Sequence, residues 1–206
     1  MELVALADRE RIVRKGYDEM AEEYHAIRGE FDHGKELKEF AALLPKNARV
    51  LDVGCGAGVP VAEFLVKSGF DVTGIDFSDN MLELARKNVP KARFIKKDMT
   101  RLDFKDNFFD GLTAFYSIIH VPREKHSSLF ESFHRILKPD GAMLVCMGPD
   151  EWEATDVYLG TTMFWSQYSP KKSLHLVRSA GFQIISDQTL VRGGEKHYWI
   201  MARNRK

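Results

Sequence analysis

The chain has 206 residues, and its 30 lysines and arginines balance 30 aspartates and glutamates, so the formal net charge is zero. This length suffices for one compact domain with a large core, and the balanced charge provides no overall attraction to nucleic acid or to a membrane surface. The first eight residues are too short and too acidic for a signal peptide, and no apolar run approaches ~18 residues. We therefore expect a cytoplasmic protein that does not cross a membrane.

The two cysteines, Cys55 and Cys146, are expected to be buried thiols in a reducing compartment. No group of histidines and cysteines has the spacing of metal ligands, so no metal site is predicted.

The N-terminal part of the chain predicts two helices. Residues 8–28 have apolar positions at helical spacing, and Tyr17 and Tyr24, seven residues apart, place both hydroxyls on one side. A second helix, over residues 35–44, is expected to end before Pro45.

A glycine-rich turn follows the first predicted strand. Residues 49–53 are mostly apolar, and three glycines at alternate positions (Gly54, Gly56 and Gly58) then lead into a helix over 59–68. Such a turn leaves backbone N–H groups free beside a surface without side chains, so a ligand can lie against it. The pattern predicts the start of a nucleotide-binding βαβ unit.

Two residues of this turn disfavour a dinucleotide. The dinucleotide fingerprint requires glycine or alanine where this chain has Val59. Asp52, within the strand, would repel a pyrophosphate, whereas its carboxylate suits a ligand that carries an ammonium group.

The second predicted strand, 70–75, ends at a carboxylate. Asp76 at the strand tip can accept hydrogen bonds from both hydroxyls of a ribose. Ser78 is a suitable N-cap for the next helix, 79–88. Phe77 and Met81 could provide an apolar wall for a base.

The third predicted strand, 92–97, is followed by Asp98 and Met99, which suit the exocyclic amine and the face of an adenine. The same region holds the basic residues that could form a nucleic-acid patch: Arg86, Lys87, Lys91, Arg93, Lys96, Lys97 and Arg101. The run lacks the interleaved aromatic residues that serve as stacking platforms, so nucleic acid is disfavoured.

The fourth predicted strand, 108–115, precedes His120, and ligands bind beyond the carboxyl ends of strands in doubly wound sheets. Two interpretations of His120 stay open: a general base, or a structural histidine that caps a helix. A helix is expected over 122–136, with His126 and His134 at its surface.

The C-terminal part contains the least regular stretch, residues 148–169, after a turn at 138–141 and a strand over 142–147. Its length and its aromatic residues predict a substrate cap, the alternative being a helix that completes the core. A helix over 170–180 and two strands, 182–191 and 196–202, complete the chain; the Gly-Gly between the strands predicts an antiparallel hairpin.

Taken together, these motifs resemble the class I S-adenosylmethionine-dependent methyltransferases, and within them the small-molecule branch called type 11. The resemblance covers about residues 10–203 and depends on the order and spacing of five blocks: Val50–Gly58, Gly74–Ser78, Lys97–Met99, Phe109–Gly111 and Leu137–Gly141.

The resemblance implies a three-layer, doubly wound (Rossmann-like) α/β sheet, mostly parallel with an antiparallel C-terminal strand. It implies one methyltransferase domain over 1–206, with an N-terminal helical lid at 1–45 and a substrate-cap insertion at 148–169. S-adenosyl-L-methionine would be the cofactor and S-adenosyl-L-homocysteine the product, with a small molecule as the methyl acceptor. We expect a monomer or a homodimer, and the sequence leaves the choice between them open.

The resemblance also assigns roles to residues, with His120 as the candidate base. The expected cofactor-binding residues are Tyr17, Tyr24, Asp52, Gly54, Gly56, Gly58, Asp76, Phe77, Met81, Asp98, Met99 and Phe115. The expected acceptor-binding residues are Tyr116, Trp152, Trp165, Tyr168 and His197.

Three other functions stay open: an RNA or protein methyltransferase, a partner subunit that binds S-adenosylmethionine without catalysis, and a dehydrogenase. The chain has Phe115–Ile118 where methyltransferases of exocyclic amines and glutamine carry an Asn-Pro-Pro-Tyr-like signature. This absence makes nucleic-acid bases and protein glutamine weaker candidates for the acceptor.

Overall fold

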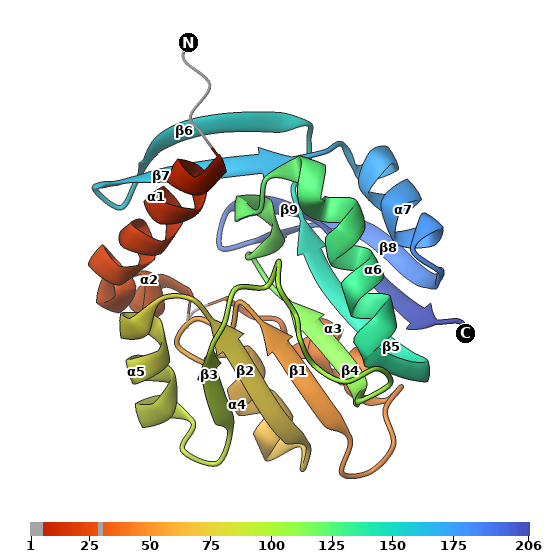
Figure 1. The fold of residues 1–206 in the computed structure, drawn as a ribbon. Coiled ribbons are helices and arrows are strands. Elements are labelled where there is room, and N and C mark those ends of the chain that lie inside the picture. Colours follow the sequence, from red (N-terminus) through yellow and green to blue (C-terminus); the bar gives the residue numbers. More distant parts are fainter. Residues whose placement is uncertain (1–5, 29–30) are drawn as a thin grey trace.

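The computed structural model describes residues 6–28 and 31–206, which form a seven-stranded sheet with helices on both faces (Figure 1). The strand order is β3-β2-β1-β4-β5-β9-β8. All neighbours pair in parallel except β9, which is antiparallel to both β5 and β8. The strands are β1 (Arg49–Val53), β2 (Asp71–Asp76), β3 (Arg93–Lys96), β4 (Phe109–Ala114), β5 (Leu137–Met147), β8 (Phe182–Arg192) and β9 (Glu195–Asn204). The predicted doubly wound fold is confirmed.

Strand β1 lies in the interior of the sheet, between β2 and β4, and is buried on both faces. Val50, Leu51 and Val53 are fully buried, as is typical of a strand covered by helices on both sides. The chain continues from β1 to β2 on one side, whereas β4 pairs with β1 on the other. This reversal of direction opens a crevice at the carboxyl ends of the strands, where doubly wound sheets bind ligands.

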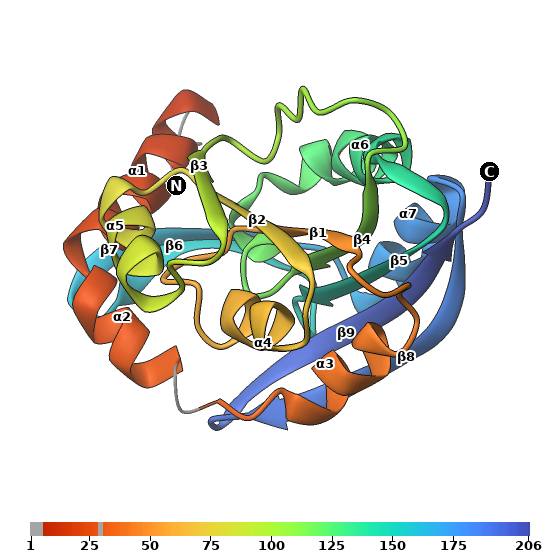
Figure 2. The same ribbon diagram turned by 90° about the horizontal axis from the view of Figure 1, so that it is seen from below.

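The helices divide between the two faces of the sheet (Figure 2). Helices α3 (Gly34–Ala41), α4 (Val61–Lys67) and α5 (Asp79–Asn88) bury apolar side chains in one core cluster. Helices α6 (His126–Ile136) and α7 (Pro170–Ser179) pack in the cluster on the other face. Ser78 is the N-cap of α5, as predicted, and its side chain accepts a hydrogen bond from Met81 N at 3.1 Å.

The predicted helix over 8–28 is two helices, α1 (Leu6–Glu19) and α2 (Ala21–Arg28). The Asp18 carbonyl accepts a hydrogen bond from Asn80 Nδ2 at 2.7 Å, and the Asp18 carboxylate accepts one from Ser78 Oγ at 2.6 Å. These bonds to the start of α5 use backbone and side-chain groups where the helix is interrupted, and they attach the N-terminal segment to the sheet domain.

The stretch 148–169 is more regular than expected, because it contains an antiparallel hairpin of β6 (Trp152–Tyr158) and β7 (Thr161–Gln167). Helix α1 packs against β7, with Val13, Met163 and Phe164 buried between them. Gly16 permits this close approach, since a Cβ there would lie 2.3 Å from Met163 Sδ. Figure 1 shows α1 and the hairpin together above the ends of the strands.

Three further local predictions need correction. The helix predicted over 122–136 begins with a separate 3₁₀ turn at Arg123–Lys125. His126 is fully buried rather than exposed, because its Nε2 lies 2.9 Å from the Val121 carbonyl. Residues 138–141 form an irregularity within β5, and the positive φ (61°) belongs to Asp140 rather than to the following glycine. Within the described residues, no helix is long and apolar enough to cross a membrane.

Candidate active site

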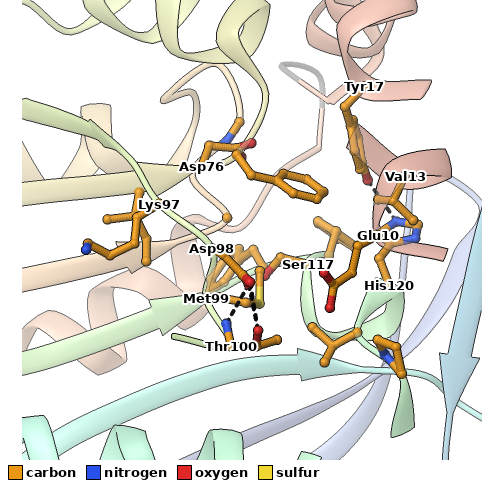
Figure 3. A pocket seen from close by; sticks show the side chains of 18 of the residues that line it. Glu10, Val13, Tyr17, Asp76, Lys97, Asp98, Met99, Thr100, Ser117 and His120 are labelled. Carbon is orange, nitrogen blue, oxygen red and sulfur yellow. Dashed lines mark hydrogen bonds between the residues drawn. The ribbon is translucent and has the colours of Figure 1, made fainter. Parts of the chain in front are cut away.

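A cavity lies at the carboxyl ends of β1, β2, β3 and β4, beneath α1. We call it the inner cavity. Figure 3 shows Asp76, Asp98 and Met99 on one side of it and Tyr17 and His120 on the other. The expected cofactor residues that line it are Tyr17, Tyr24, Gly54, Gly56, Asp76, Phe77, Asp98, Met99 and Phe115.

The glycine turn gives the inner cavity one wall. Gly54 and Gly56 have φ values of +68° and +51°, in the region that favours glycine. A Cβ on Gly54 would lie 2.3 Å from Ser117 Cβ, whereas a Cβ on Gly56 would meet only Met81 Sδ, at 3.9 Å. Gly54 is therefore needed for packing, and Gly56 leaves the open surface that a ligand requires.

The backbone N–H groups of this turn are not free, contrary to the prediction. Those of Gly54 and Cys55 both donate to the Ile75 carbonyl, at 2.8 and 3.0 Å. The N–H of Gly56 donates to Asp76 Oδ2 at 3.0 Å. The turn therefore contributes its shape and holds the Asp76 carboxylate in place.

Asp76 is a buried carboxylate at the tip of β2, 9% exposed. Its second oxygen, Oδ1, accepts a hydrogen bond from Ser78 N at 2.9 Å. Burial raises the pKa of Asp76, while the backbone donors at Ser78 and Gly56 oppose that rise. A carboxylate fixed in this way can accept further hydrogen bonds from hydroxyl groups in the inner cavity.

Asp98 and Met99 follow β3 and lie beside Asp76 (Figure 3). Asp98 Oδ1 accepts hydrogen bonds from the backbone N and Oγ1 of Thr100, at 2.8 and 2.9 Å. Its orientation is therefore set by its own turn. Together with the apolar side chains of Met99 and Phe77, it gives this end of the cavity the character that an adenine base requires.

A second, smaller cavity adjoins the first on the far side of the glycine turn; we call it the polar cavity. Asp52, Arg28, His25 and His33 line it, and Gly54, Gly56 and Tyr116 belong to both cavities. Asp52 is 1% exposed, and its Oδ1 accepts a hydrogen bond from Thr113 Oγ1 at 2.8 Å. Its Oδ2 is buried and has no hydrogen-bond partner.

The unpaired oxygen has an electrostatic consequence. The pKa of Asp52 is raised to about 7, chiefly by burial, which the Thr113 hydrogen bond opposes and the charge of Asp76 reinforces. A cationic group at Oδ2 would restore the ordinary pKa of this carboxylate.

A third depression, the outer pocket, lies on the other side of Tyr17 and is lined mainly by aromatic rings. Trp152, Trp165 and Tyr158 come from the β6–β7 hairpin, and His197 comes from β9. Four residues line both the outer pocket and the inner cavity: Tyr17, Tyr24, Tyr116 and His120. These four residues form the wall between the two spaces, and we call them the partition.

The two hydrogen bonds of His120 fix which of its ring nitrogens carries the proton. Its Nδ1 lies 2.7 Å from the Phe164 carbonyl, which can only accept, so Nδ1 carries the proton. Its Nε2 is therefore the acceptor for the Tyr17 hydroxyl, 2.8 Å away (Figure 3). Burial lowers the pKa of His120 to about 4, and burial raises that of Tyr17 well above its ordinary value. At neutral pH this pair is a neutral imidazole with a basic Nε2 and an intact phenol.

Three expected site residues line none of these spaces. Gly58 lies against the side chains of α5 and β3, and Met81 is buried beneath the glycine turn with Ala57. Tyr168 packs on the His126 ring and beneath the Arg123 guanidinium, with centroid distances of 5.9 and 5.5 Å. Sequence spacing placed each of these residues near the site, but Gly58 faces α5 and β3, and packing directs the side chains of Met81 and Tyr168 elsewhere.

Sequence reasoning missed Arg28 and Tyr158. Arg28 follows Tyr24 by four residues, and its guanidinium lies over the Tyr24 ring at 5.0 Å. The 17, 24, 28 spacing on one helical side could have revealed it. Tyr158 ends β6, within the segment that was expected to be irregular.

The residues present fit S-adenosylmethionine. The inner cavity offers a buried carboxylate for ribose hydroxyls and a mixed polar and apolar end for a base. Asp52 supplies an unpaired buried oxygen for an ammonium group, and Gly56 leaves the cradle open. The doubly wound sheet with one antiparallel strand, and this site at its switch point, define a class I methyltransferase architecture.

Comparison with known proteins agrees with this class. Residues 50–141 match the family model described as "Methyltransferase domain". The chain is 25% identical to YqeM of Bacillus subtilis, a protein whose name assigns it to the methyltransferases, over 88% of this chain and 78% of YqeM. It is 35% identical to the demethylmenaquinone methyltransferase of Staphylococcus epidermidis over 50% of this chain, and it spans 43% of that enzyme.

Among solved structures, the 1,6-didemethyltoxoflavin-N1-methyltransferase of Burkholderia thailandensis, with 1,6-didemethyltoxoflavin and S-adenosylhomocysteine bound, superposes with a TM-score of 0.77. It is 19% identical and covers all of this chain and 93% of its own, which demonstrates a shared fold. The methyltransferase domain over residues 50–141, the methyltransferase relatives and the shared fold together support a class I S-adenosylmethionine-dependent methyltransferase, and S-adenosylmethionine is the cofactor of that class.

Proposed function

We propose that this protein transfers the methyl group of S-adenosylmethionine to a small-molecule acceptor that occupies the outer pocket. When bound, the cofactor supplies a methyl group on a positively charged sulfur. The acceptor atom forms a bond to the methyl carbon as the bond from carbon to sulfur breaks. The electron pair of that bond remains on sulfur, giving neutral S-adenosylhomocysteine, and the acceptor proton passes to a base or to water.

The partition is the observation that carries this proposal. The partition residues line both the inner cavity, whose residues suit the cofactor, and an aromatic pocket that suits an apolar or planar molecule. Alignment of the acceptor with the reacting methyl is worth roughly 7–11 kcal/mol in well-oriented reactions. Two adjoining spaces on either side of one wall provide that alignment.

His120 would accept the proton. Its Nε2 is basic because the Phe164 carbonyl holds the proton on Nδ1, and Tyr17 is the group now hydrogen bonded to Nε2. An acceptor O–H or N–H could replace the Tyr17 hydroxyl at that nitrogen. The low pKa of His120 leaves Nε2 unprotonated at neutral pH, so this nitrogen is free to accept a proton when the acceptor loses one.

We further propose that the N-terminal segment is a lid and the β6–β7 hairpin a cap. Both supply residues to the partition or to the outer pocket, and α1 packs on β7. Because the Phe164 carbonyl belongs to the hairpin and Tyr17 to α1, the position of the cap also sets the tautomer and the environment of His120.

The alternatives have less support. Several of the basic residues near β3 form ion pairs, among them Lys96 with Asp79 and Lys97 with Asp103, both at 2.5 Å, which lowers the charge available to RNA. A non-catalytic subunit would need a cofactor site but has no use for a basic nitrogen at the partition. The names of two compared enzymes, demethylmenaquinone and 1,6-didemethyltoxoflavin methyltransferases, favour quinol-like or heteroaromatic acceptors.

We place the protein in the cytoplasm, as a monomer or homodimer. Cys55 and Cys146 are both buried free thiols, which accords with a reducing compartment.

Calorimetry followed by a transfer assay tests the proposal. S-adenosylhomocysteine should bind and NAD should not. Labelled methyl groups should then pass from S-adenosylmethionine to at least one member of a panel of quinols, heteroaromatic rings and sterols. Failure to bind the thioether would overturn the proposal, and binding without transfer to any member would favour the non-catalytic subunit.

A further inference from the structure

The β6–β7 hairpin brings aromatic rings and a carboxylate together in the outer pocket. Trp152, Asp156 and Tyr158 occupy alternate positions of β6, so their side chains lie on one face of the hairpin. Trp165 pairs with Ala154 across the hairpin and therefore shares this face, diagonally next to Trp152 and Asp156. Four of these residues line the outer pocket, and we call them the hairpin cluster: Trp152, Asp156, Tyr158 and Trp165.

The three rings of the hairpin cluster are set at different angles. The centroids of Trp152 and Trp165 lie 5.6 Å apart, with 31° between the ring planes. Tyr158 stands nearly perpendicular to Trp165, at 6.3 Å and 87°. Trp152 is 41% exposed, so its ring is available to a ligand. Rings at such angles can offer more than one π face to the same ligand, and π faces attract a positively charged group.

Asp156 is a carboxylate without an ionic partner. Its Oδ1 accepts a hydrogen bond from the adjacent Val157 N–H at 2.8 Å, and no lysine, arginine or histidine of the described residues forms an ion pair with it. The other carboxylate of the outer pocket, Glu195, already has a cation, because its Oε2 lies 2.9 Å from Arg28 Nη1. Of the two carboxylates, Asp156 is therefore the one that can receive a cation from a ligand.

The two histidines of the outer pocket do not offset the charge of Asp156. Burial lowers the pKa of both His120 and His197 to about 4, so both rings are neutral at pH 7. Since Arg28 is paired with Glu195, the lining carries one uncompensated negative charge beside aromatic faces. Such a lining attracts an ammonium group and repels an anionic acceptor.

We propose that the methyl acceptor carries a cationic amino group and that the hairpin cluster binds this group. The inference rests on the proposed function, because it assumes that the outer pocket holds the acceptor. An ammonium nitrogen has no lone pair, so it cannot attack the methyl carbon and serves to orient the acceptor. The nucleophilic atom is then a second group, a hydroxyl or a neutral nitrogen, directed at the partition and His120. The acceptor class is an aromatic or heteroaromatic compound that bears a cationic amine.

Three phenols that differ in one substituent test the preference for charge. Tyramine, 4-ethylphenol and 3-(4-hydroxyphenyl)propanoate end in an ammonium group, a hydrogen atom and a carboxylate. Calorimetry measures their binding to the protein saturated with S-adenosylhomocysteine. Tyramine should bind about tenfold or more tightly than 4-ethylphenol, as expected for a cation held by aromatic rings and a carboxylate, and the propanoate should bind most weakly. Tetramethylammonium, at constant ionic strength, tests the hairpin cluster without an aromatic scaffold and should change the tryptophan fluorescence.

Asp156→Asn removes the charge but keeps an oxygen for the Val157 N–H. It should lower the preference for tyramine to about threefold or less while changing the affinity for 4-ethylphenol by less than about twofold. Asp150→Asn is the matched control, because it makes the same substitution at an exposed residue that does not line the outer pocket. It should keep the wild-type preference. Binding of S-adenosylhomocysteine reports that each variant is folded.

The inference is overturned if neither cation binds, if tyramine binds no more tightly than the neutral or the anionic phenol, or if Asp156→Asn keeps the full preference. An equal loss in Asp150→Asn would also overturn it, since charge at a distance would then explain the effect. The proposed function fails separately, if the wild type does not bind S-adenosylhomocysteine or transfers a methyl group to no acceptor of any charge.

Discussion

The inner cavity and the outer pocket share the partition but are built in opposite ways. The inner cavity is formed at the ends of neighbouring strands, and its carboxylates are held by backbone N–H groups and by adjacent side chains. The outer pocket is formed by side chains from α1, α2, the β6–β7 hairpin and β9, which are far apart in the sequence. Backbone geometry therefore fixes the inner cavity, whereas individual side chains shape the outer pocket.

This difference implies that changes on the two sides should separate in experiments. Variants of the inner cavity should alter binding of S-adenosylhomocysteine, and variants of the outer pocket should alter use of the acceptor. A residue of the partition should affect turnover without weakening either ligand strongly.

The largest effect is expected from His120→Asn. Asparagine can keep the donor to the Phe164 carbonyl but removes the basic Nε2. We expect kcat with the identified acceptor to fall by about 10²-fold or more, as for loss of a general base, with the affinity for S-adenosylhomocysteine changed less than about threefold. Unchanged turnover would assign His120 a structural role only. Tyr17→Phe, which removes the hydroxyl on Nε2 but leaves the imidazole, is the matched control and should retain more turnover than His120→Asn.

Asp76→Ala should weaken binding of the cofactor product in the inner cavity. It leaves ribose hydroxyls and the Gly56 and Ser78 N–H groups without their acceptor, so S-adenosylhomocysteine should bind about 30- to 100-fold more weakly. Calorimetry measures the loss, and a thermal melt shows whether the variant folds. Asp79→Ala removes an exposed carboxylate of the same segment and should leave the affinity as it is. Equal losses in both variants would contradict a specific role for Asp76.

The affinity for S-adenosylhomocysteine should depend on pH through Asp52. An ammonium ligand favours ionised Asp52, whose pKa is raised to about 7 by burial, so binding expels a proton below that pH. The affinity for S-adenosylhomocysteine should rise by about tenfold from pH 6 to pH 8, since one pKa unit corresponds to a factor of ten. Asp52→Asn should bind with little change over this range. The same slope in that variant would show that another group titrates.

The ligand-free protein should respond to pH with the opposite sign. A folded pKa above the unfolded value means that the folded protein holds the Asp52 proton between about pH 4 and pH 7. The contribution of Asp52 to stability is therefore lost as the pH rises through that range. Asp52→Asn should reduce this part of the pH dependence in thermal melts.

The smallest effect is expected from a substitution in the outer pocket. Trp165→Leu removes ring area that contacts His120 and Trp152, at centroid distances of 5.7 and 5.6 Å. We expect KM for the acceptor to rise by about fivefold, consistent with the loss of roughly 1 kcal/mol of aromatic contact. Binding of S-adenosylhomocysteine should not change. A loss confined to cofactor binding would mean that the outer pocket is not the acceptor site.

Local sequence determined the cofactor side of this protein. A glycine turn with Asp52 before it, and carboxylates at Asp76 and Asp98, can be read in order because parallel strands bring consecutive carboxyl ends to one edge of the sheet. The sequence also marked the N-cap Ser78 and the antiparallel C-terminal hairpin, since capping and Gly-Gly turns depend on neighbouring residues.

Tertiary structure decided the shape of the outer pocket and the positions of single side chains. The hydrogen bonds of His120 join residues 103 and 44 positions away in the chain. The Arg28–Glu195 pair, the displacement of Tyr168 and Met81 from the site, and the unpaired oxygen of Asp52 likewise follow from contacts between distant segments. A spacing rule reaches only about two helical turns or one strand, so it can indicate that a residue lies near the site but not where its side chain points.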